Sequence, residues 1–263
     1  MSGGTSRLRG FEATLVAVSH GTSDPRGQGA VRRLVQRIGD RLPGVDVRQA
    51  FVDVEAPDLP AVLADVDGPA TVVPLLLGAG FHVHVDIATA VDERIAAGQP
   101  TATASTLGPD PAITGLLLDR LRDAKLSTED VVVLAVAGSS DVRARLSADR
   151  AGAMLATALR RRVRVGHLGG AGRPLEQVID EARRGTGRGR VIAANYLLAP
   201  GFFASRLDMS SADVVTAPLS AGVRLDDRLV DVAVRRYWSP AGRSQRVSGR
   251  YPHASRSPLA RLG

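Results

Sequence analysis

A chain of 263 residues, 44% of them hydrophobic, can bury one large core or the cores of two ordinary domains. The absence of cysteine excludes disulfides, thiolate nucleophiles and cysteine-ligated zinc or iron–sulfur sites. The formal net charge of +7 raises the question of a polyanionic partner, and the answer depends on where the charge lies.

The excess of positive charge lies at the C-terminal end of the sequence. From residue 232 onward there are seven arginines and no acidic residue, whereas residues 1–231 contain 27 basic and 27 acidic residues. Residues 239–263 are rich in Ser, Pro, Gly and Arg, which predicts a basic, disordered tail. Binding of a polyanion by this tail is the alternative to a solvated extension. Because the rest of the chain is neutral, we expect no nucleic-acid partner.

We expect neither a signal peptide nor a membrane segment. The start, MSGGTSRLRG, has two arginines, but they are not followed by the apolar h-region of a signal peptide. No apolar run approaches the roughly 18 residues needed to cross a bilayer. We therefore expect a cytoplasmic protein without a membrane partner.

Apolar, β-rich runs alternate with helical patterns along the chain. The runs are near-continuous, which is typical of parallel strands buried on both faces. Asp24-Pro25 and Asp110-Pro111 each place an N-cap residue before a proline suited to the first helical position. The pattern predicts an α/β fold with mostly parallel sheets. The predicted strands are residues 13–18, 45–52, 70–77, 101–105, 131–136, 163–167, 190–197 and 214–217.

The sequence also repeats itself. HGTSD at 20–24 aligns with AGSSD at 137–141, an offset of 117, and each segment follows an apolar run. Pro57 and Pro174 share this offset, and each opens a helical stretch. GF at 80–81 aligns with GF at 201–202. These matches predict two similar Rossmann-like lobes, residues 11–125 and 126–238, with a ligand cleft between them.

Two histidines of the first lobe are absent from the aligned positions of the second. His20 aligns with Ala137, and His82 aligns with Phe203. Both histidines are expected just past the carboxyl end of a strand, where loops present side chains to the cleft. A neutral imidazole can bind a divalent metal and can accept a proton near neutral pH. The sequence therefore predicts His20 and His82 as a metal-handling, catalytic pair.

The other three histidines lack the paired pattern that marks His20 and His82. His84 is two residues from His82 and points the opposite way on an extended segment, but it becomes a third metal ligand if the loop turns. His167 ends a predicted strand without a partner motif, so we expect a structural or surface role. His253 lies in the tail and is expected to be solvated.

Five motifs occur in an order and spacing that match a known family. They are SHGTSDPRG (19–27), PLLLGAGFHVHVDI (74–87), TLGPDP (106–111), LAVAGSSD (134–141) and YLLAPGFFASRLD (196–208). The first three resemble the sirohydrochlorin chelatases of the class II tetrapyrrole chelatase family, and the last two resemble the C-terminal half of its two-lobed members. Where many relatives have Asp-Ile-Pro, residues 86–88 read Asp-Ile-Ala, which weakens a helix-start signal without touching the chemistry.

The resemblance implies a chelatase-like fold and a lyase activity. The reaction is insertion of Fe²⁺ or Co²⁺ into sirohydrochlorin, in siroheme or cobalamin biosynthesis, with the metal as co-substrate and no organic cofactor. The family's two catalytic histidines carry over onto His20 and His82. The sequence favours neither metal and neither pathway. We favour a monomer, because two lobes in one chain can form the whole cleft.

Backbone groups in two loops are suited to binding the carboxylates of such a substrate. The N–H groups around residues 21–23 and 78–80 precede predicted helices, and a helix N-terminus attracts anions. We therefore expect substrate contacts from Gly21, Thr22, Ser23, Gly80 and Phe81.

Acidic and basic residues near these loops are less clearly assigned. Asp53 and Glu55 follow the second predicted strand and are the nearest candidates for the family's acidic pocket residues, the alternative being a solvated strand end. Arg26 is expected to be an exposed residue at a helix start rather than a carboxylate ligand.

Other functions are weighed against this prediction. His20-Gly21-Thr22 also resembles the start of a histidine phosphatase, but those enzymes have arginine where this chain has Ser19. No GxGxxG spacing follows the first strand, which argues against dinucleotide binding. A non-catalytic metal or tetrapyrrole carrier and a ferrochelatase acting on another tetrapyrrole are the alternatives kept.

Overall fold

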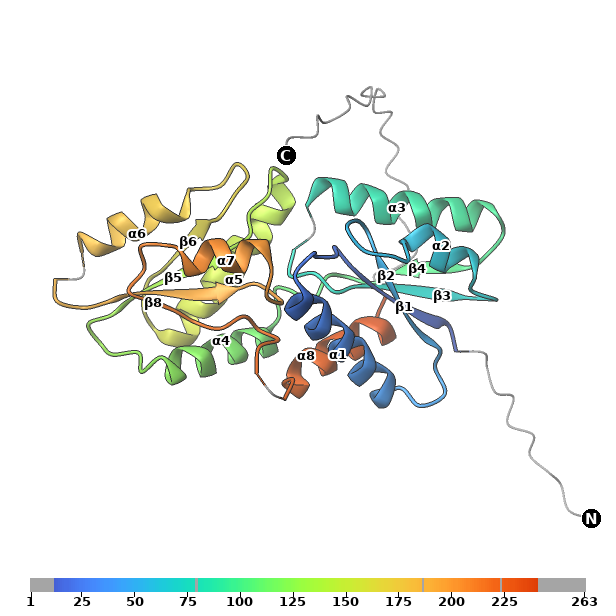
Figure 1. Ribbon diagram of the computed structural model, residues 1–263, viewed down its shortest axis with the longest axis horizontal. Helices are drawn as coiled ribbons and strands as arrows, with labels where there is room; N and C mark the ends of the chain where they lie inside the picture. The colour runs from blue at the N-terminus through green and yellow to red at the C-terminus, as the bar shows by residue number, and fades with distance from the viewer. Residues whose placement is uncertain (1–11, 79, 186, 223, 241–263) are drawn as a thin grey trace, which may run out of the picture.

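The computed structural model describes residues 12–78, 80–185, 187–222 and 224–240, with the backbone alone for residues 81–83. Residues 241–263 of the predicted tail therefore lie outside the described part. Figure 1 shows two lobes side by side, each built of strands alternating with helices. None of the helices described is long and apolar enough to span a membrane.

The elements follow in chain order. They are β1 (Thr14–Ser19), α1 (Pro25–Arg41), β2 (Val47–Phe51), α2 (Leu59–Ala64), β3 (Ala70–Pro74), α3 (Phe81–Ala96), β4 (Thr101–Thr103), α4 (Pro111–Asp123), β5 (Val131–Val136), α5 (Val142–Leu159), β6 (Val163–His167), α6 (Leu175–Arg183), β7 (Val191–Tyr196), α7 (Phe202–Asp208), β8 (Val214–Val215) and α8 (Asp227–Trp238).

Each lobe contains a four-stranded parallel sheet. The strand orders are β2-β1-β3-β4 and β6-β5-β7-β8, so equivalent strands occupy equivalent places. The strand pairs of both sheets are parallel in the described residues. The predicted α/β architecture of two similar lobes with parallel sheets is confirmed. The predicted strand limits differ from those observed by three residues or fewer.

The two predicted helix starts are also confirmed. The Asp24 carboxylate accepts the N–H of Arg26 at 2.8 Å, and the Asp110 carboxylate accepts the N–H of Ala112 at 2.9 Å. A proline follows each cap at the start of α1 and α4. Local sequence therefore sets both helix starts.

The alignment of Pro57 with Pro174 is wrong by one residue. Isolated β-bridges pair Phe51 with Asp58 in the first lobe and His167 with Pro174 in the second. The structural counterpart of Pro174 is therefore Asp58, the N-cap of α2, and Pro57 lies just before it. The same bridges make His167 the counterpart of Phe51.

One face of each sheet is covered by two helices of its own lobe. On the first sheet these are α2 and α3, and on the second they are α6 and α7. Buried aliphatic side chains fill both layers, which stabilises each sheet by removing apolar surface from water. Their members include Val16, Val18, Val72, Leu59 and Ile87 in the first lobe and Val133, Ala193, Leu175, Val178 and Leu207 in the second.

The other face of each sheet receives a helix from the opposite half of the chain. Helix α8 follows β8 in sequence but packs on α1 and β3 of the first lobe, whereas α4 follows β4 but packs on α5 and β7 of the second. The Tyr237 hydroxyl of α8 donates to the Ala13 carbonyl at 2.6 Å, and Arg37 of α1 pairs with Asp227 at 2.5 Å. The final helices of the two repeats are thus exchanged. The division of the chain into repeats at residues 11–125 and 126–238 stays a prediction from the sequence.

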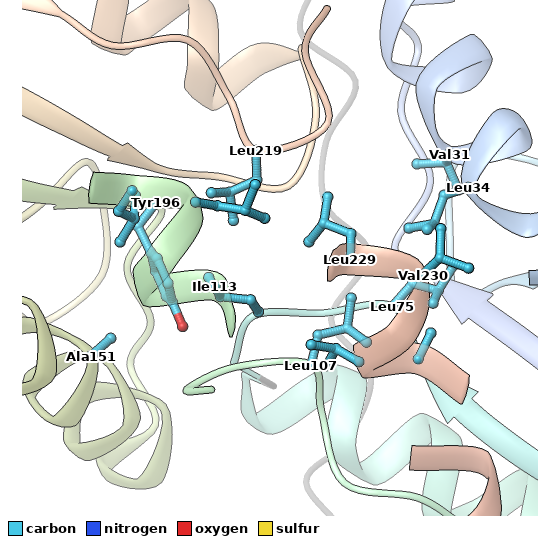
Figure 2. Close-up of a cluster of buried hydrophobic side chains, with 14 of the residues drawn as sticks. Val31, Leu34, Leu75, Leu107, Ile113, Ala151, Tyr196, Leu219, Leu229 and Val230 are labelled. Carbon is cyan, nitrogen blue, oxygen red and sulfur yellow. The ribbon is translucent and has the colours of Figure 1, made fainter. Parts of the chain in front are cut away.

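The exchange produces a hydrophobic cluster common to both lobes. In Figure 2, Leu229 and Val230 of α8 lie beside Val31 and Leu34 of α1, while Ile113 of α4 lies toward the second lobe. These side chains belong to a cluster that also includes buried residues of β1, β5 and β7. Because close-packed interiors resist deformation, the shared cluster fixes the two lobes relative to each other.

Candidate active site

A cleft of about 680 Å³ lies between the lobes, at the carboxyl ends of the strands. This volume is in the range of sites that bind small organic ligands. Most of the lining comes from loops that follow strands of both sheets, as expected for parallel α/β proteins. The lining comprises residues 20–23, 75–78, 80, 136–140 and 196–204, with Val54, Ala144, Arg145, Ala148 and His167.

Loops of the two lobes interlock along this cleft. A Cβ atom on Gly27 of α1 would lie 2.3 Å from the Pro200 carbonyl oxygen of the second lobe. A Cβ atom on Gly80 would lie 3.2 Å from Oγ of Ser139. The first helix of each lobe therefore begins against the loop that precedes the third helix of the other. Both walls of the cleft come from one chain.

His20 lies where the sequence places it, immediately after the fully buried strand β1. Its side chain is exposed and lines the cleft. Gly21 follows with φ of 93°, and a Cβ atom there would lie 2.1 Å from the Asp53 carbonyl oxygen. The second lobe repeats this turn, since Gly138 also has φ of 93°. Only glycine combines this backbone conformation with such a close approach.

Glu55 supports the His20 loop from the adjacent strand end. Its Oε1 accepts the backbone N–H of Thr22 at 2.9 Å. The Asp53 carboxylate accepts the N–H of Val54 at 2.8 Å, and Asp53 N–H donates to the His20 carbonyl at 3.0 Å. Neither acid is among the lining residues, whereas Val54 between them is. The two carboxylates are thus directed to backbone groups, and the Thr22 N–H is already satisfied.

The Glu55 contact predicts a measurable loss of order in the loop. Replacing Glu55 by Ala is expected to speed hydrogen exchange of the Thr22 amide about tenfold, because a hydrogen bond to a carboxylate contributes roughly 1.5 kcal/mol. Glu55→Gln keeps an acceptor oxygen and should change the rate less. Exchange measured by NMR tests this, with amides of β5 as the internal control. Equal exchange in wild type and Glu55→Ala would contradict the role.

His82 lies at the second position of helix α3, which begins at Phe81 after the N-cap Gly80. The prediction of a loop position for His82 is therefore wrong, because the helix begins one residue before it. Gly80 lines the cleft. The side chains of Phe81 and His82 lie outside the described residues, so their predicted contacts stay predictions.

His84 lies on the first turn of the same helix, with its N–H donating to the Gly80 carbonyl at 2.9 Å. Residues two apart on a helix do not share a face. The His84 side chain is exposed, and its pKa is lowered by partial burial and by the nearby charge of Arg143. It is not among the described lining residues, nor do the described side chains contain a group of three potential metal ligands.

Arg26 is an exposed helix-start residue, as expected. Its guanidinium pairs with Asp24 at 2.8 Å, and its side chain is 73% exposed. The Asp24 carboxylate both caps the helix and pairs with Arg26. Arg26 is not among the residues that line the cleft.

The second lobe contributes side chains to the cleft that the sequence did not indicate. His167, expected to be structural or at the surface, is 7% exposed and lines the cleft. Arg145 of α5 lines it as well. Phe202 and Phe203 pack edge to face with ring centroids 5.3 Å apart, and Phe202 is 69% exposed. In the sequence, only the alignment of Phe203 with His82 pointed to this part of the second lobe.

The chemistry of the lining is apolar and weakly basic. Aliphatic and aromatic side chains from residues 75–77, 197–199 and 202–203 supply most of it. Among the described lining residues there is no aspartate or glutamate, and Arg145 is the one that carries a permanent charge. Such a site is suited to a large, flat, apolar ligand that carries negative groups at its edge.

Comparisons with known proteins agree with this geometry. The CbiX family model matches residues 14–124, which run from β1 to the end of α4. No curated protein matches the chain in sequence.

Solved structures match over most of the chain. SirB from Bacillus subtilis with Fe³⁺ has a TM-score of 0.68 and 17% identity, covering 87% of this chain and 95% of that one. The sirohydrochlorin chelatase SirB from Bacillus subtilis subspecies spizizenii, in complex with cobalt, has a TM-score of 0.65 and 15% identity, covering 87% and 94%. CbiX, the terminal enzyme for siroheme biosynthesis in denitrifying bacteria, has a TM-score of 0.59 and 19% identity, covering 83% and 97%.

Residues 14–124 match the CbiX family model, and the fold resembles that of SirB and CbiX. The structural matches show the two-lobed chelatase fold over 83–87% of the chain. Within the CbiX domain, His20 and the turn at 21–23 face the cleft. The opposite wall, with Arg145 and His167, comes from outside the matched region.

Proposed function

We propose that this protein is a sirohydrochlorin chelatase, a lyase that inserts Fe²⁺ or Co²⁺ into sirohydrochlorin. The CbiX domain at residues 14–124 supports this proposal, as do the matches to SirB with Fe³⁺ and with cobalt. The product would serve siroheme or cobalamin biosynthesis, and the sequence and fold favour neither.

The observation that carries the proposal is the composition of the inter-lobe cleft. An exposed imidazole, His20, faces a space lined mainly by apolar side chains, with Arg145 at its edge. The apolar lining is suited to the faces of a macrocycle, and the cation is suited to its carboxylates. The lack of acidic side chains among the described lining residues avoids repulsion of a polyanion.

The reaction assigns distinct tasks to the residues. The metal substrate exchanges water for nitrogen ligands, and imidazole is suited to both Fe²⁺ and Co²⁺. As the ion enters the ring, two pyrrole N–H bonds break and four metal–nitrogen bonds form. We assign ion binding to His20 and His82, with one of them accepting one pyrrole proton and the second proton passing to water in the cleft. The turn at residues 21–23 positions His20 and contacts the substrate.

The test is metallation followed by absorption. Purified protein mixed anaerobically with sirohydrochlorin and Co²⁺ or Fe²⁺, without ATP, is expected to exceed the spontaneous rate by at least about a hundredfold. Tight binding of sirohydrochlorin without acceleration would indicate a carrier instead. Acceleration with protoporphyrin alone would indicate a ferrochelatase acting on another tetrapyrrole. Either result would overturn the proposal.

One chain provides both walls of the cleft, which supports a monomer as the functional unit. The monomeric state and the cytoplasmic location stay predictions of the sequence.

A further inference from the structure

Arg145 is a charged side chain of the cleft that takes no part in the exchange of metal and protons. It is half-buried on α5 and lines the cleft, and its Nη1 donates to the Ser140 carbonyl at 2.8 Å. None of the described carboxylates forms an ion pair with it. Arg143, two residues earlier, differs in that it pairs with Asp141 at 3.0 Å. The hydrogen bond to Ser140 thus holds a guanidinium at the cleft with donors to spare.

His167 is a buried polar side chain in the same wall. It is 7% exposed, lines the cleft at the end of β6, and its Nδ1 is buried without a hydrogen-bond partner. The ring packs against Gly172, where a Cβ atom would lie 2.2 Å from Cδ2. Leaving such a group unsatisfied costs about 1–3 kcal/mol. The Nδ1 atom itself is inaccessible, so a ligand in the cleft meets the accessible part of the His167 ring.

Arg145 and His167 act on each other electrostatically. The pKa of His167 is lowered mainly by burial; the charge of Asp149 raises it and that of Arg145 lowers it further. Arg145, which forms no ion pair with a described carboxylate, places a positive charge at this wall. An anion bound there would therefore be attracted by Arg145 without displacing another carboxylate.

The turn before α5 adds a third contribution. Residues 138–140 line the cleft, and Gly138 with φ of 93° aims the turn as Gly21 does in the first lobe. Helix α5 has 18 residues, and its N-terminus adds a partial positive charge beside the carboxylate of its N-cap, Asp141. The turn, the guanidinium and the buried imidazole thus lie in the wall that the second lobe contributes to the cleft, whereas His20 belongs to the first lobe.

We propose that Arg145, His167 and the Ser139–Ser140 turn form a carboxylate-binding subsite that anchors the edge of the tetrapyrrole to the second lobe. The inference rests on the proposed function and deepens it. It gives the second lobe a binding task in place of the metal-handling histidines that it lacks. Anchoring by a peripheral carboxylate fixes the position of the ring without contributing to the metal–nitrogen exchange.

The experiment measures binding and turnover separately. The Kd for metal-free sirohydrochlorin and for uroporphyrin is measured by fluorescence in wild type, Arg145→Gln and His167→Phe. Arg145→Gln is expected to raise both Kd values at least tenfold, and His167→Phe about threefold or more. Arg150→Gln, an exposed arginine further along α5, is the matched control and should leave them unchanged. Circular dichroism verifies that each variant is folded.

Turnover and salt dependence distinguish a binding contact from a structural one. For metallation, Arg145→Gln should raise KM with kcat within about twofold of wild type, because the contact is made equally before and during the chemical step. Added salt should weaken binding less in Arg145→Gln than in wild type.

Each outcome decides between the subsite and the function. Equal Kd values in wild type and Arg145→Gln overturn the subsite, even where metallation proceeds. Binding that depends on Arg145 without any metallation overturns the chelatase function and leaves the subsite standing. A wild-type protein that binds neither tetrapyrrole overturns both.

Discussion

Replacing His20 by Ala is expected to lower kcat for metallation of sirohydrochlorin by at least about a hundredfold, and replacing His82 by Ala is expected to have a similar effect. Loss of a general base alone lowers rates by a factor of about 10²–10⁴, and these residues are also assigned to ion binding. His20 is exposed to the cleft directly after β1, so truncation removes the imidazole without opening a cavity in the core.

Initial rates of metallation at saturating Co²⁺ measure this effect. The Kd for metal-free sirohydrochlorin should stay within about threefold of wild type, since the apolar lining and Arg145 are untouched. His253→Ala, a histidine of the predicted tail, is the matched control. Undiminished rates in both His20→Ala and His82→Ala would overturn the site assignment while leaving the chelatase fold unaffected.

Replacing Asp110 by Ala is expected to lower the free energy of unfolding by about 3 kcal/mol. The Asp110 side chain is 8% exposed; it caps α4 and pairs with Arg235 at 3.0 Å and Arg236 at 3.2 Å, both on α8. One carboxylate thus joins the two exchanged helices. Breaking a buried ion pair costs about 3–5 kcal/mol, and we take the lower end because Arg235 is half exposed.

Urea unfolding followed by circular dichroism measures this loss. Asp58→Ala is the matched control, because Asp58 caps α2 by accepting the Ala61 N–H at 2.8 Å without a pairing arginine. Its expected cost is about 1 kcal/mol, the ordinary value of an N-cap. Asp110→Asn keeps a capping oxygen and should fall between the two. Equal losses for Asp110→Ala and Asp58→Ala would show that the ion pairs to α8 contribute nothing.

The exchange of α4 and α8 is the part of the fold that sequence patterns could not predict. An amphipathic helix shows which of its faces is buried but not which sheet covers it. The periodicity of α8 predicts that Leu229 and Val230 are buried, but it does not show which of the two lobes buries them. The decision comes from partners distant in sequence, such as Tyr237 with Ala13 and Asp227 with Arg37.

The candidate site was predicted in part. His20, Gly21, Thr22, Ser23 and Gly80 line the cleft, because residues that follow parallel strands must gather at one edge of the sheet. Glu55 was chosen for its position after a strand, but its carboxylate is directed to the Thr22 N–H. The direction of a side chain at a strand end depends on backbone donors that the sequence does not place.

Two residues of the second lobe, His167 and Arg145, could not be assigned to the site from the sequence. His167 has no motif around it, and Arg145 is one arginine among many in this sequence. Both become notable through burial, an unsatisfied Nδ1 and the absence of a carboxylate partner among the described residues. These are properties of the surroundings, and they exist once β6 and α5 are packed.

The sequence by itself determined the alternation of strands and helices, the capped helix starts, the repeat and the position of His20 at a strand end. Each of these depends on residues within one turn or one strand, where local sterics, hydrogen bonding and apolar patterning act directly. The tertiary structure alone decided the helix exchange, the interlocking of the loops and the basic wall opposite the CbiX domain. Those features arise from contacts between different elements of the fold, some of them more than one hundred positions apart, such as Gly27 with Pro200 and Asp110 with Arg235.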